Sequence, residues 1–263
     1  MFDLDAYLAR VGLGEGDPTL AEVHLAHVTS IPFESLDPHC GLPVSLEEDD
    51  LAAKLLASNR GGYCFEQNLL LKSALEALGA EVELYLARVL VAADPNAPRP
   101  RTHLLLGVEW QGERWHADVG FGGGTLLEPI PWGPGGEHEQ AGWTYRVIER
   151  SSEYVLQTGT ADGWADLYAF LPFPVPKADI EAANWFTSTY PASRFVDGFL
   201  VSRQWPDGRR LVLSDWAGPA LVELTPREVN HTPVDREQLP ELLADRFGLT
   251  GFALDADARL VRR

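Results

Sequence analysis

The chemistry and the first part of the fold are set by the stretch Arg60-Gly61-Gly62-Tyr63-Cys64-Phe65-Glu66-Gln67-Asn68. Two glycines lead into the cysteine, and leucines at helical spacing follow it as far as Gly79. The sequence therefore predicts that Cys64 begins a helix. Because the free amides and the dipole of a helix start favour an anion, we expect the Cys64 thiol to ionise more easily than a free thiol. Such a thiolate is a candidate nucleophile, although the run also fits a structural cysteine buried beneath a helix cap.

The composition is that of a soluble globular enzyme, with 45% hydrophobic and 23% charged residues in a chain of 263. This length allows one large domain or two to three small ones. The formal net charge of -18 argues against nucleic acid and anionic membranes as partners. It also opposes a polyanionic cofactor, unless a local basic patch or a helix terminus overrides the overall charge.

Cysteine and histidine usage gives no metal site. Two cysteines, Cys40 and Cys64, are too few for a disulfide framework or an all-cysteine zinc site. His24 and His27 are spaced for one helix face but have no third ligand nearby, so we interpret them as a solvated face. The acidic N-terminus does not resemble a signal peptide, and no apolar stretch reaches membrane-spanning length. We expect a cytoplasmic protein.

The first third of the chain is predicted to be helical. Apolar spacing predicts a helix that ends at Gly12, and Thr19 with Glu22 forms a capping box that begins a second helix. Ser45 with Glu48 has the pattern of another capping box. The prolines of residues 31–38 predict a loop.

The middle third is predicted to form a small antiparallel barrel or sandwich. Gln111-Gly112 is a two-residue turn between two of its strands. Residues 129–142, rich in proline, glycine and charge, are the segment expected to be most mobile. The predicted strands span residues 81–93, 102–110, 114–119, 143–150, 154–158 and 164–170.

The last third mixes both types of element. A helix is predicted over residues 178–188 and another over 235–247. Between them, residues 199–205 and 209–216 flank Pro206-Asp207-Gly208, which predicts a hairpin.

A cysteine nucleophile needs a base and a group that orients the base. His103 begins an apolar strand, and the turn at Gln111-Gly112 brings Asp118 roughly level with it on the paired strand. Neighbouring His and Asp side chains have the arrangement that a Cys-His-Asp relay requires. A structural His-Asp pair, hydrogen-bonded to each other in a core, would show the same pattern. His116 is a rival base, because it lies two residues before Asp118 and points the same way on a strand. Cys40, which is in a loop, is the weaker nucleophile candidate.

Three segments together resemble the arylamine N-acetyltransferases. Residues 60–66 are similar to the cysteine motif of that family, residues 101–103 to its histidine motif and residues 118–122 to its aspartate motif. Residues 31–36 and 183–191 also match the pattern, so that the likeness runs nearly end to end. The resemblance selects His103 over His116.

The resemblance implies an α+β fold with a Cys-His-Asp core like that of cysteine proteinases. Residues 1–80 would form a helical domain with the nucleophile, residues 81–190 a β-barrel with His103 and Asp118, and residues 191–263 an α/β lid. It implies a ping-pong reaction in which Cys64 takes the acetyl group of acetyl-coenzyme A and passes it to an arylamine or arylhydrazine. His103 would move the protons and Asp118 would orient its ring.

Coenzyme A is the one cofactor-like partner implied. We expect Thr102, Gly122, Gly123 and Gly124 to contribute to a basic or amide-lined cleft for it, against the negative charge of the chain and of Glu128 nearby. No metal, nucleic acid or membrane partner is expected, and no oligomeric state is predicted.

Three rival functions keep some of these residues. An amide synthase would close a macrolactam from a carrier-bound acyl chain with the same three side chains. A Cys-His-Asp hydrolase would pass the acyl group to water. A non-catalytic binding domain would not need the thiol of Cys64 at all.

Overall fold

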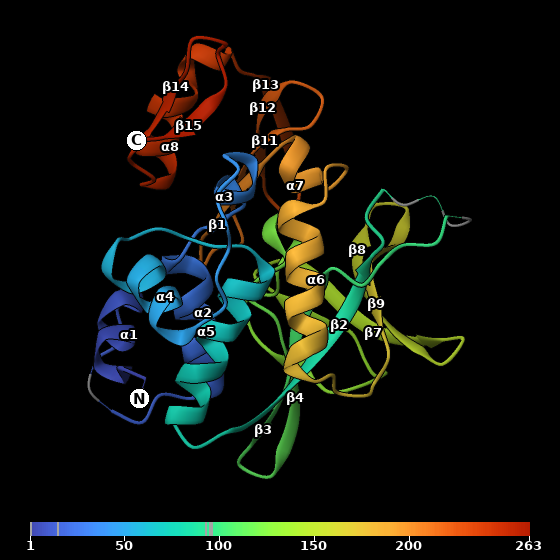
Figure 1. The fold of residues 1–263 in the computed structure, drawn as a ribbon. Coiled ribbons are helices and arrows are strands. Elements are labelled where there is room, and N and C mark those ends of the chain that lie inside the picture. The colour runs from blue at the N-terminus through green and yellow to red at the C-terminus, as the bar shows by residue number, and fades with distance from the viewer. Residues whose placement is uncertain (1, 15, 93, 95–96) are drawn as a thin grey trace.

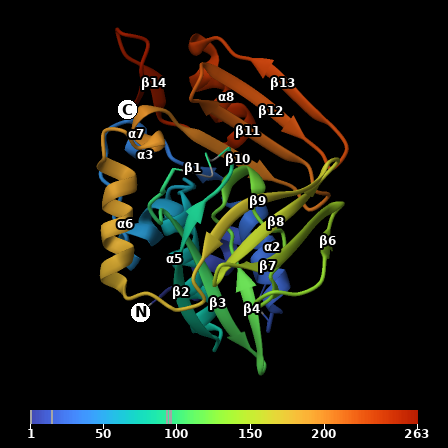
Figure 2. The same ribbon diagram turned by 90° about the vertical axis from the view of Figure 1, so that its right-hand side faces the viewer.

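The chain folds into a bundle of helices, an eight-stranded antiparallel sheet that curves into an incomplete barrel, and a smaller C-terminal sheet with its own helix (Figures 1 and 2). This computed structural model describes residues 2–14, 16–92, 94 and 97–263. The predicted α+β class is confirmed. Within the described residues, no helix is long and apolar enough to cross a membrane. The division of the chain at residues 80 and 190 stays a prediction.

The N-terminal helices bury one continuous apolar cluster against the barrel. α1 ends at Gly12 in the left-handed conformation, with φ 78°, and the capping box of Thr19 with Glu22 is confirmed at the start of α2. Leucines of α5 pack with Leu106 and Val108 of β3 (His103–Trp110), which fixes the cysteine helix to the sheet. The helices are α1 (Leu4–Val11), α2 (Leu20–Ser30), α4 (Glu48–Leu51), which continues as a π-helix over Ala52–Ala57, and α5 (Cys64–Ala77).

Two predictions for this region are wrong. Ser45 does not cap a helix, because its hydroxyl donates to the carboxylate of Asp50 while α4 begins at Glu48. Residues 31–38 are not a loop but contain β1 (Phe33–Glu34) and α3 (Leu36–His39). β1 forms by pairing with β10 (Leu200–Gln204), far along the chain, so the local prolines alone did not indicate it.

The eight-stranded sheet has the order β5-β4-β3-β2-β9-β8-β7-β6. Gln111 and Gly112 have φ of 53° and 82°, as a two-residue hairpin turn requires. β2 ends at Val89, and position 93 at the end of that predicted strand lies outside the described residues. The strands are β2 (Glu81–Val89), β3 (His103–Trp110), β4 (Glu113–Ala117), β5 (Ile130–Pro131), β6 (His138–Gln140), β7 (Trp143–Arg150), β8 (Glu153–Thr160) and β9 (Gly163–Phe170).

The prediction that residues 129–142 form a loop is wrong, because both end strands of the sheet come from this segment. β5 pairs with β4, and β6 pairs with β7. The side chain of Gln140 joins the two ends: its oxygen accepts from the amides of Leu127 and Glu128, and its amide donates to the Glu128 carbonyl. This side chain closes the barrel where no strand pairing does.

The C-terminal part forms a five-stranded sheet of order β1-β10-β11-β12-β13, so its first strand comes from the N-terminal part of the chain. The predicted hairpin of β10 and β11 is confirmed, and the helix predicted over 235–247 is a 3-10 turn followed by α8. The elements are α6 (Lys177–Thr189), α7 (Arg194–Asp197), β10 (Leu200–Gln204), β11 (Arg210–Asp215), β12 (Pro219–Leu224), β13 (Val229–Pro233), α8 (Leu239–Phe247), β14 (Phe252–Leu254) and β15 (Leu260–Arg262).

A buried charge network fixes the loop before Cys64. Arg60 binds Glu34 through Nε at 2.6 Å and Asp37 through Nη2 at 2.8 Å, and all three side chains are at most 6% exposed. Lys54 joins Asp37 to Glu66 of α5, with both distances 2.6 Å. The network therefore connects β1, α3, the π-helix and the cysteine helix.

The same arginine reaches the C-terminal part of the fold. Its guanidinium lies over the ring of Phe252 in β14, 5.0 Å from the ring centroid. One side chain thus holds the cysteine loop, β1 and the C-terminal region in one arrangement.

We expect Arg60→Met to lower the free energy of unfolding by about 3–5 kcal/mol, because it leaves buried carboxylates without their partner. The measurement is chemical denaturation at neutral pH. Lys72→Met is the matched control, since Lys72 forms one exposed pair with Glu76 and its loss should cost less than about 0.5 kcal/mol. Equal costs for the two variants would contradict a structural role for the network.

Candidate active site

Cys64 is the first residue of α5, as the sequence predicts, and close backbone contacts set its position. A Cβ at Gly61 would lie 1.9 Å from the Pro32 carbonyl oxygen, so the loop before the cysteine fits only without a side chain there. A Cβ at Gly120 would lie 2.7 Å from the Cα of Cys64. Glycine at both positions lets two loops meet at the start of the cysteine helix.

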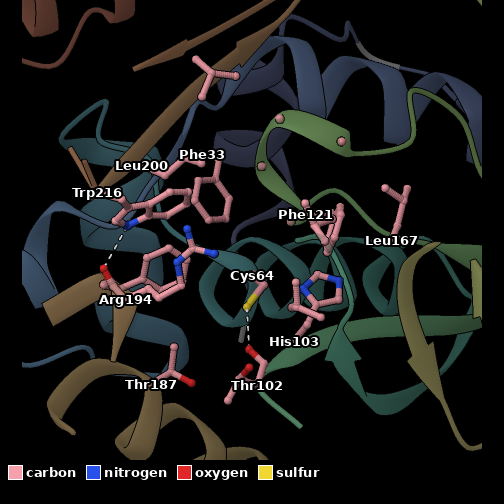
Figure 3. Close-up of a pocket in the computed structure, with 18 of the residues that line it drawn as sticks. Phe33, Cys64, Thr102, His103, Phe121, Leu167, Thr187, Arg194, Leu200 and Trp216 are labelled. Carbon is pink, nitrogen blue, oxygen red and sulfur yellow. Dashed lines mark hydrogen bonds between the residues drawn. The ribbon is translucent and has the colours of Figure 1, made fainter. Parts of the chain in front are cut away.

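His103 and Asp118 meet beside the cysteine. His103 Nε2 lies 2.7 Å from Asp118 Oδ2, and these side chains are 2% and 1% exposed. Figure 3 shows the Cys64 sulfur next to the His103 ring, with the Thr102 carbonyl accepting from the thiol at 3.6 Å. Since Nε2 is engaged by Asp118, Nδ1 is the nitrogen left for Cys64. The structure therefore brings the three predicted side chains together.

The pair holds opposite charges in a buried place. Burial lowers the pKa of His103, but the charge and hydrogen bond of Asp118, with a smaller contribution from Cys64, outweigh it and raise that pKa to about 10. Burial raises the pKa of Asp118, but the His103 charge and the hydrogen bonds of His103, Asn68 and Gly120 lower it to about 2. At neutral pH the site thus holds an imidazolium on a carboxylate.

Asn68 joins Asp118 to the cysteine helix, four residues after Cys64. Its amide donates to Asp118 Oδ1 at 3.0 Å and to the Leu104 carbonyl at 2.7 Å, and its oxygen accepts from the Val119 amide. Sequence reasoning missed this residue. The signal was present, because residues four apart share a helix face.

His24 and His27 are fully buried, so their interpretation as a solvated face is wrong. Burial lowers the pKa of His24 to about 4, so its ring is neutral at pH 7. Its Nδ1 donates to the Leu127 carbonyl at 3.0 Å, and Nε2 accepts from the backbone amide of Asp118 at 3.2 Å. His27 lies between the Tyr7 hydroxyl and the Gln67 side chain. Both histidines lie on the buried face of α2 with Leu20, Val23 and Val28, whereas the opposite face is exposed at Glu22.

The rival residues take other positions. His116 bonds to the Tyr168 hydroxyl at 2.7 Å inside the barrel, and burial lowers its pKa to about 4. Cys40 donates to the Leu260 carbonyl, and burial with the charges of nearby carboxylates raises its pKa to about 11. Of the two candidate bases, His103 is thus the one bonded to Asp118, while His116 is bonded to Tyr168.

A cleft of about 680 Å³ leads to Cys64 and His103. Thr102, Gly122, Gly123 and Gly124, the predicted coenzyme A residues, all line it, and their role stays a prediction. The last three form a 3-10 turn that a Gln204 side chain holds by the Gly122 carbonyl. The cleft also has aromatic walls, from Phe33, Phe121, Phe186, Tyr190, Phe195 and Trp216. This shape suits a flat apolar substrate.

Comparison with known proteins gives a consistent result. A family model described as N-acetyltransferase matches residues 18–254. An arylamine N-acetyltransferase of Mycolicibacterium smegmatis is 41% identical over 215 residues, 79% of this chain and 78% of that protein. One of Escherichia coli is 35% identical over 256 residues, with 94% and 88% covered. The Mycobacterium marinum arylamine N-acetyltransferase in complex with CoA is 36% identical, with a TM-score of 0.88 and 94% and 92% covered.

We expect Asp118→Asn to convert His103 from an imidazolium to a neutral ring at pH 7, because burial then acts without the opposing charge. The measurement is the NMR titration of the His103 ring nitrogens. In the wild type, the raised pKa of His103 and the lowered pKa of Asp118 mean that this pair stabilises the fold fully between about pH 3.8 and pH 6.5, and that the stabilisation is lost as the pH rises through about 10 or falls through about 2. An unchanged His103 titration in the variant would refute this electrostatic assignment.

We expect His24→Ala to lower kcat/KM and to cost about 1–3 kcal/mol of stability, because the Asp118 amide and the Leu127 carbonyl lose their partner. Activity assays, denaturation and the His103 titration would be compared. His231, which is exposed, gives the control His231→Ala. A loss of stability with unchanged activity and unchanged His103 titration would show that His24 does not position Asp118.

Proposed function

The chain belongs to the arylamine N-acetyltransferase family, and we propose on that basis that Cys64, His103 and Asp118 carry its chemistry. The protein transfers the acetyl group of acetyl-coenzyme A to the nitrogen of an arylamine or arylhydrazine. The observation that supports the assignment of residues is the buried contact of His103 with Asp118 beside the thiol at the floor of the cleft.

In the first half-reaction, the Cys64 thiol gives its proton to His103, and the resulting thiolate attacks the carbonyl carbon of the thioester. The bond from carbonyl carbon to coenzyme A sulfur breaks, and the His103 imidazolium gives its proton to the leaving sulfur. The products are acetyl-Cys64, free coenzyme A and a neutral His103. Asp118 keeps the ring oriented through the 2.7 Å contact at Nε2.

In the second half-reaction, the amine nitrogen attacks the acetyl carbon of acetyl-Cys64. Neutral His103 takes a proton from the nitrogen, and the Cys64 thiolate leaves. The thiolate and imidazolium are thereby restored. Arylamines are neutral at pH 7, so they enter the aromatic cleft ready to attack.

The similarity to arylamine N-acetyltransferases does not favour the amide synthase or the hydrolase as the function. The cytoplasmic location expected from the sequence stays a prediction.

Intact-mass analysis tests the nucleophile. After mixing with acetyl-coenzyme A, we expect the wild type to gain one acetyl group and Cys64→Ser to gain none. Adding an arylamine should remove the group from the wild type and give the acetylated amine. Cys40→Ser is the control, because Cys40 lies outside the residues that line the cleft, and it should still form the adduct. An adduct on Cys64→Ser would overturn the assignment.

A further inference from the structure

The cleft is positively charged in a strongly acidic protein. The chain has 39 acidic and 21 basic residues. Among the described residues that line the cleft there is no aspartate or glutamate, yet Arg99, Arg194 and Arg210 all line it. Although acidic residues outnumber basic ones in the chain, the charged side chains that the structure describes at the cleft are all basic. Such a cleft favours the binding of an anion.

Arg194 lies on the wall opposite the catalytic histidine. Figure 3 shows Arg194 and Trp216 on one side of the cleft and His103 on the other, with Cys64 between them. The guanidinium lies 3.9 Å from the centroid of the Trp216 ring, and the Trp216 indole donates to the Arg194 carbonyl at 3.0 Å. The tryptophan thus orients the cation without using its hydrogen-bond donors.

The charges of Arg194 and Arg99 have no counter-ion in the part of the chain that the structure describes: no carboxylate lies within ion-pair distance of either guanidinium. The two cations are close enough to repel, since burial and then the Arg99 charge lower the pKa of Arg194. Two guanidinium groups held together without an acid leave a place for an anion with several oxygens.

Arg210 is a third and deeper cation, only 4% exposed. It donates to the Gly123 carbonyl at 2.9 Å, to the Thr125 carbonyl and to the Tyr145 hydroxyl, and its Nε has no partner among the described residues. It also forms no ion pair within them. An unpaired buried charge is costly, so a nearby anion would be favoured.

We propose that Arg194 and Arg99 bind the phosphate groups of acetyl-coenzyme A, and that Arg210 fixes the turn of Gly122–Gly124 and adds its positive field. This assignment rests on the proposed function. The phosphates of the donor are the anionic groups that the reaction brings into the cleft in every turnover, whereas the acceptor nitrogen is neutral. Planar guanidinium groups match phosphate oxygens through paired hydrogen bonds.

The test compares two donors that differ in their phosphates. Acetyl-coenzyme A carries them, and S-acetylpantetheine has the same thioester and pantetheine arm without them. We expect Arg194→Gln to lower kcat/KM for acetyl-coenzyme A at least about tenfold more than for S-acetylpantetheine, the size of a lost charge-assisted contact. Arg99→Gln should act in the same direction, and the double variant should lose more than either. The salt dependence of kcat/KM with acetyl-coenzyme A should also become weaker.

The matched control is Arg203→Gln. Arg203 is also an exposed arginine over a tryptophan, 5.1 Å from the Trp205 ring centroid, but it does not line the cleft. Arg203→Gln should leave kcat/KM unchanged with both donors. Equal losses of Arg194→Gln with both donors would overturn the proposal in favour of a structural role. A loss confined to 4-aminobenzoate as acceptor, with aniline unchanged, would assign the arginines to an acceptor carboxylate and would overturn it as well.

The two proposals fail in distinguishable ways. If wild-type Cys64 is acetylated by S-acetylpantetheine, the nucleophile assignment holds whatever the arginine variants do. If neither donor acetylates Cys64, the proposed catalytic assignment fails, and the arginine proposal is decided by the affinity for coenzyme A itself: Arg194→Gln should weaken it and Arg203→Gln should not, and equal affinities would overturn the proposal.

Discussion

The site depends on the buried contact between His103 and Asp118. A carboxylate with 1% exposure is stable only where donors surround it. Besides His103, α5 contributes the Asn68 amide and the loop after β4 contributes the Gly120 amide. His24 of α2 accepts from the backbone amide of Asp118 and so holds its main chain. The helices and the barrel are therefore joined through Asp118, which we propose orients the His103 ring. A shift of the helices relative to the barrel would displace this contact.

The position of Cys64 follows from the same principle of close contact. The loop before it has no space for side chains at Gly61, and Arg60 anchors it to β1 and α3 through two buried carboxylates. Buried ion pairs contribute little net stability, since desolvation offsets the attraction. Their effect here is to specify one arrangement, because a cation with two fixed acids and an aromatic partner fits in only one position. The thiol is thus placed by a network whose residues do not line the cleft.

Local patterns predicted the parts of this structure that local interactions determine. The glycines before Cys64 and the leucines after it define a helix start, and Gln111-Gly112 defines a hairpin, so the placement of Cys64 at a helix start and the roughly level, diagonal positions of His103 and Asp118 could be predicted from the residues. Two of the wrong predictions involve distant contacts. β1 exists because β10 pairs with it, and the buried His24 ring bonds to the Leu127 carbonyl, 103 residues later. No short window of the sequence contains both partners.

One cleft has to accept two unlike substrates in turn. The acceptor is flat, apolar and neutral, and the aromatic walls offer it surface without requiring a charge. The donor is long and highly anionic, and a chain with net charge -18 repels it until it reaches the cleft. Arginines at the cleft that lack carboxylate partners resolve this conflict, because they act over short distances where the screened field of the surface is weak. Stacking on Trp216 keeps one of these cations in place without neutralising it. The apolar wall and the cation can then be parts of the same surface, and the two substrates can use a single thiol.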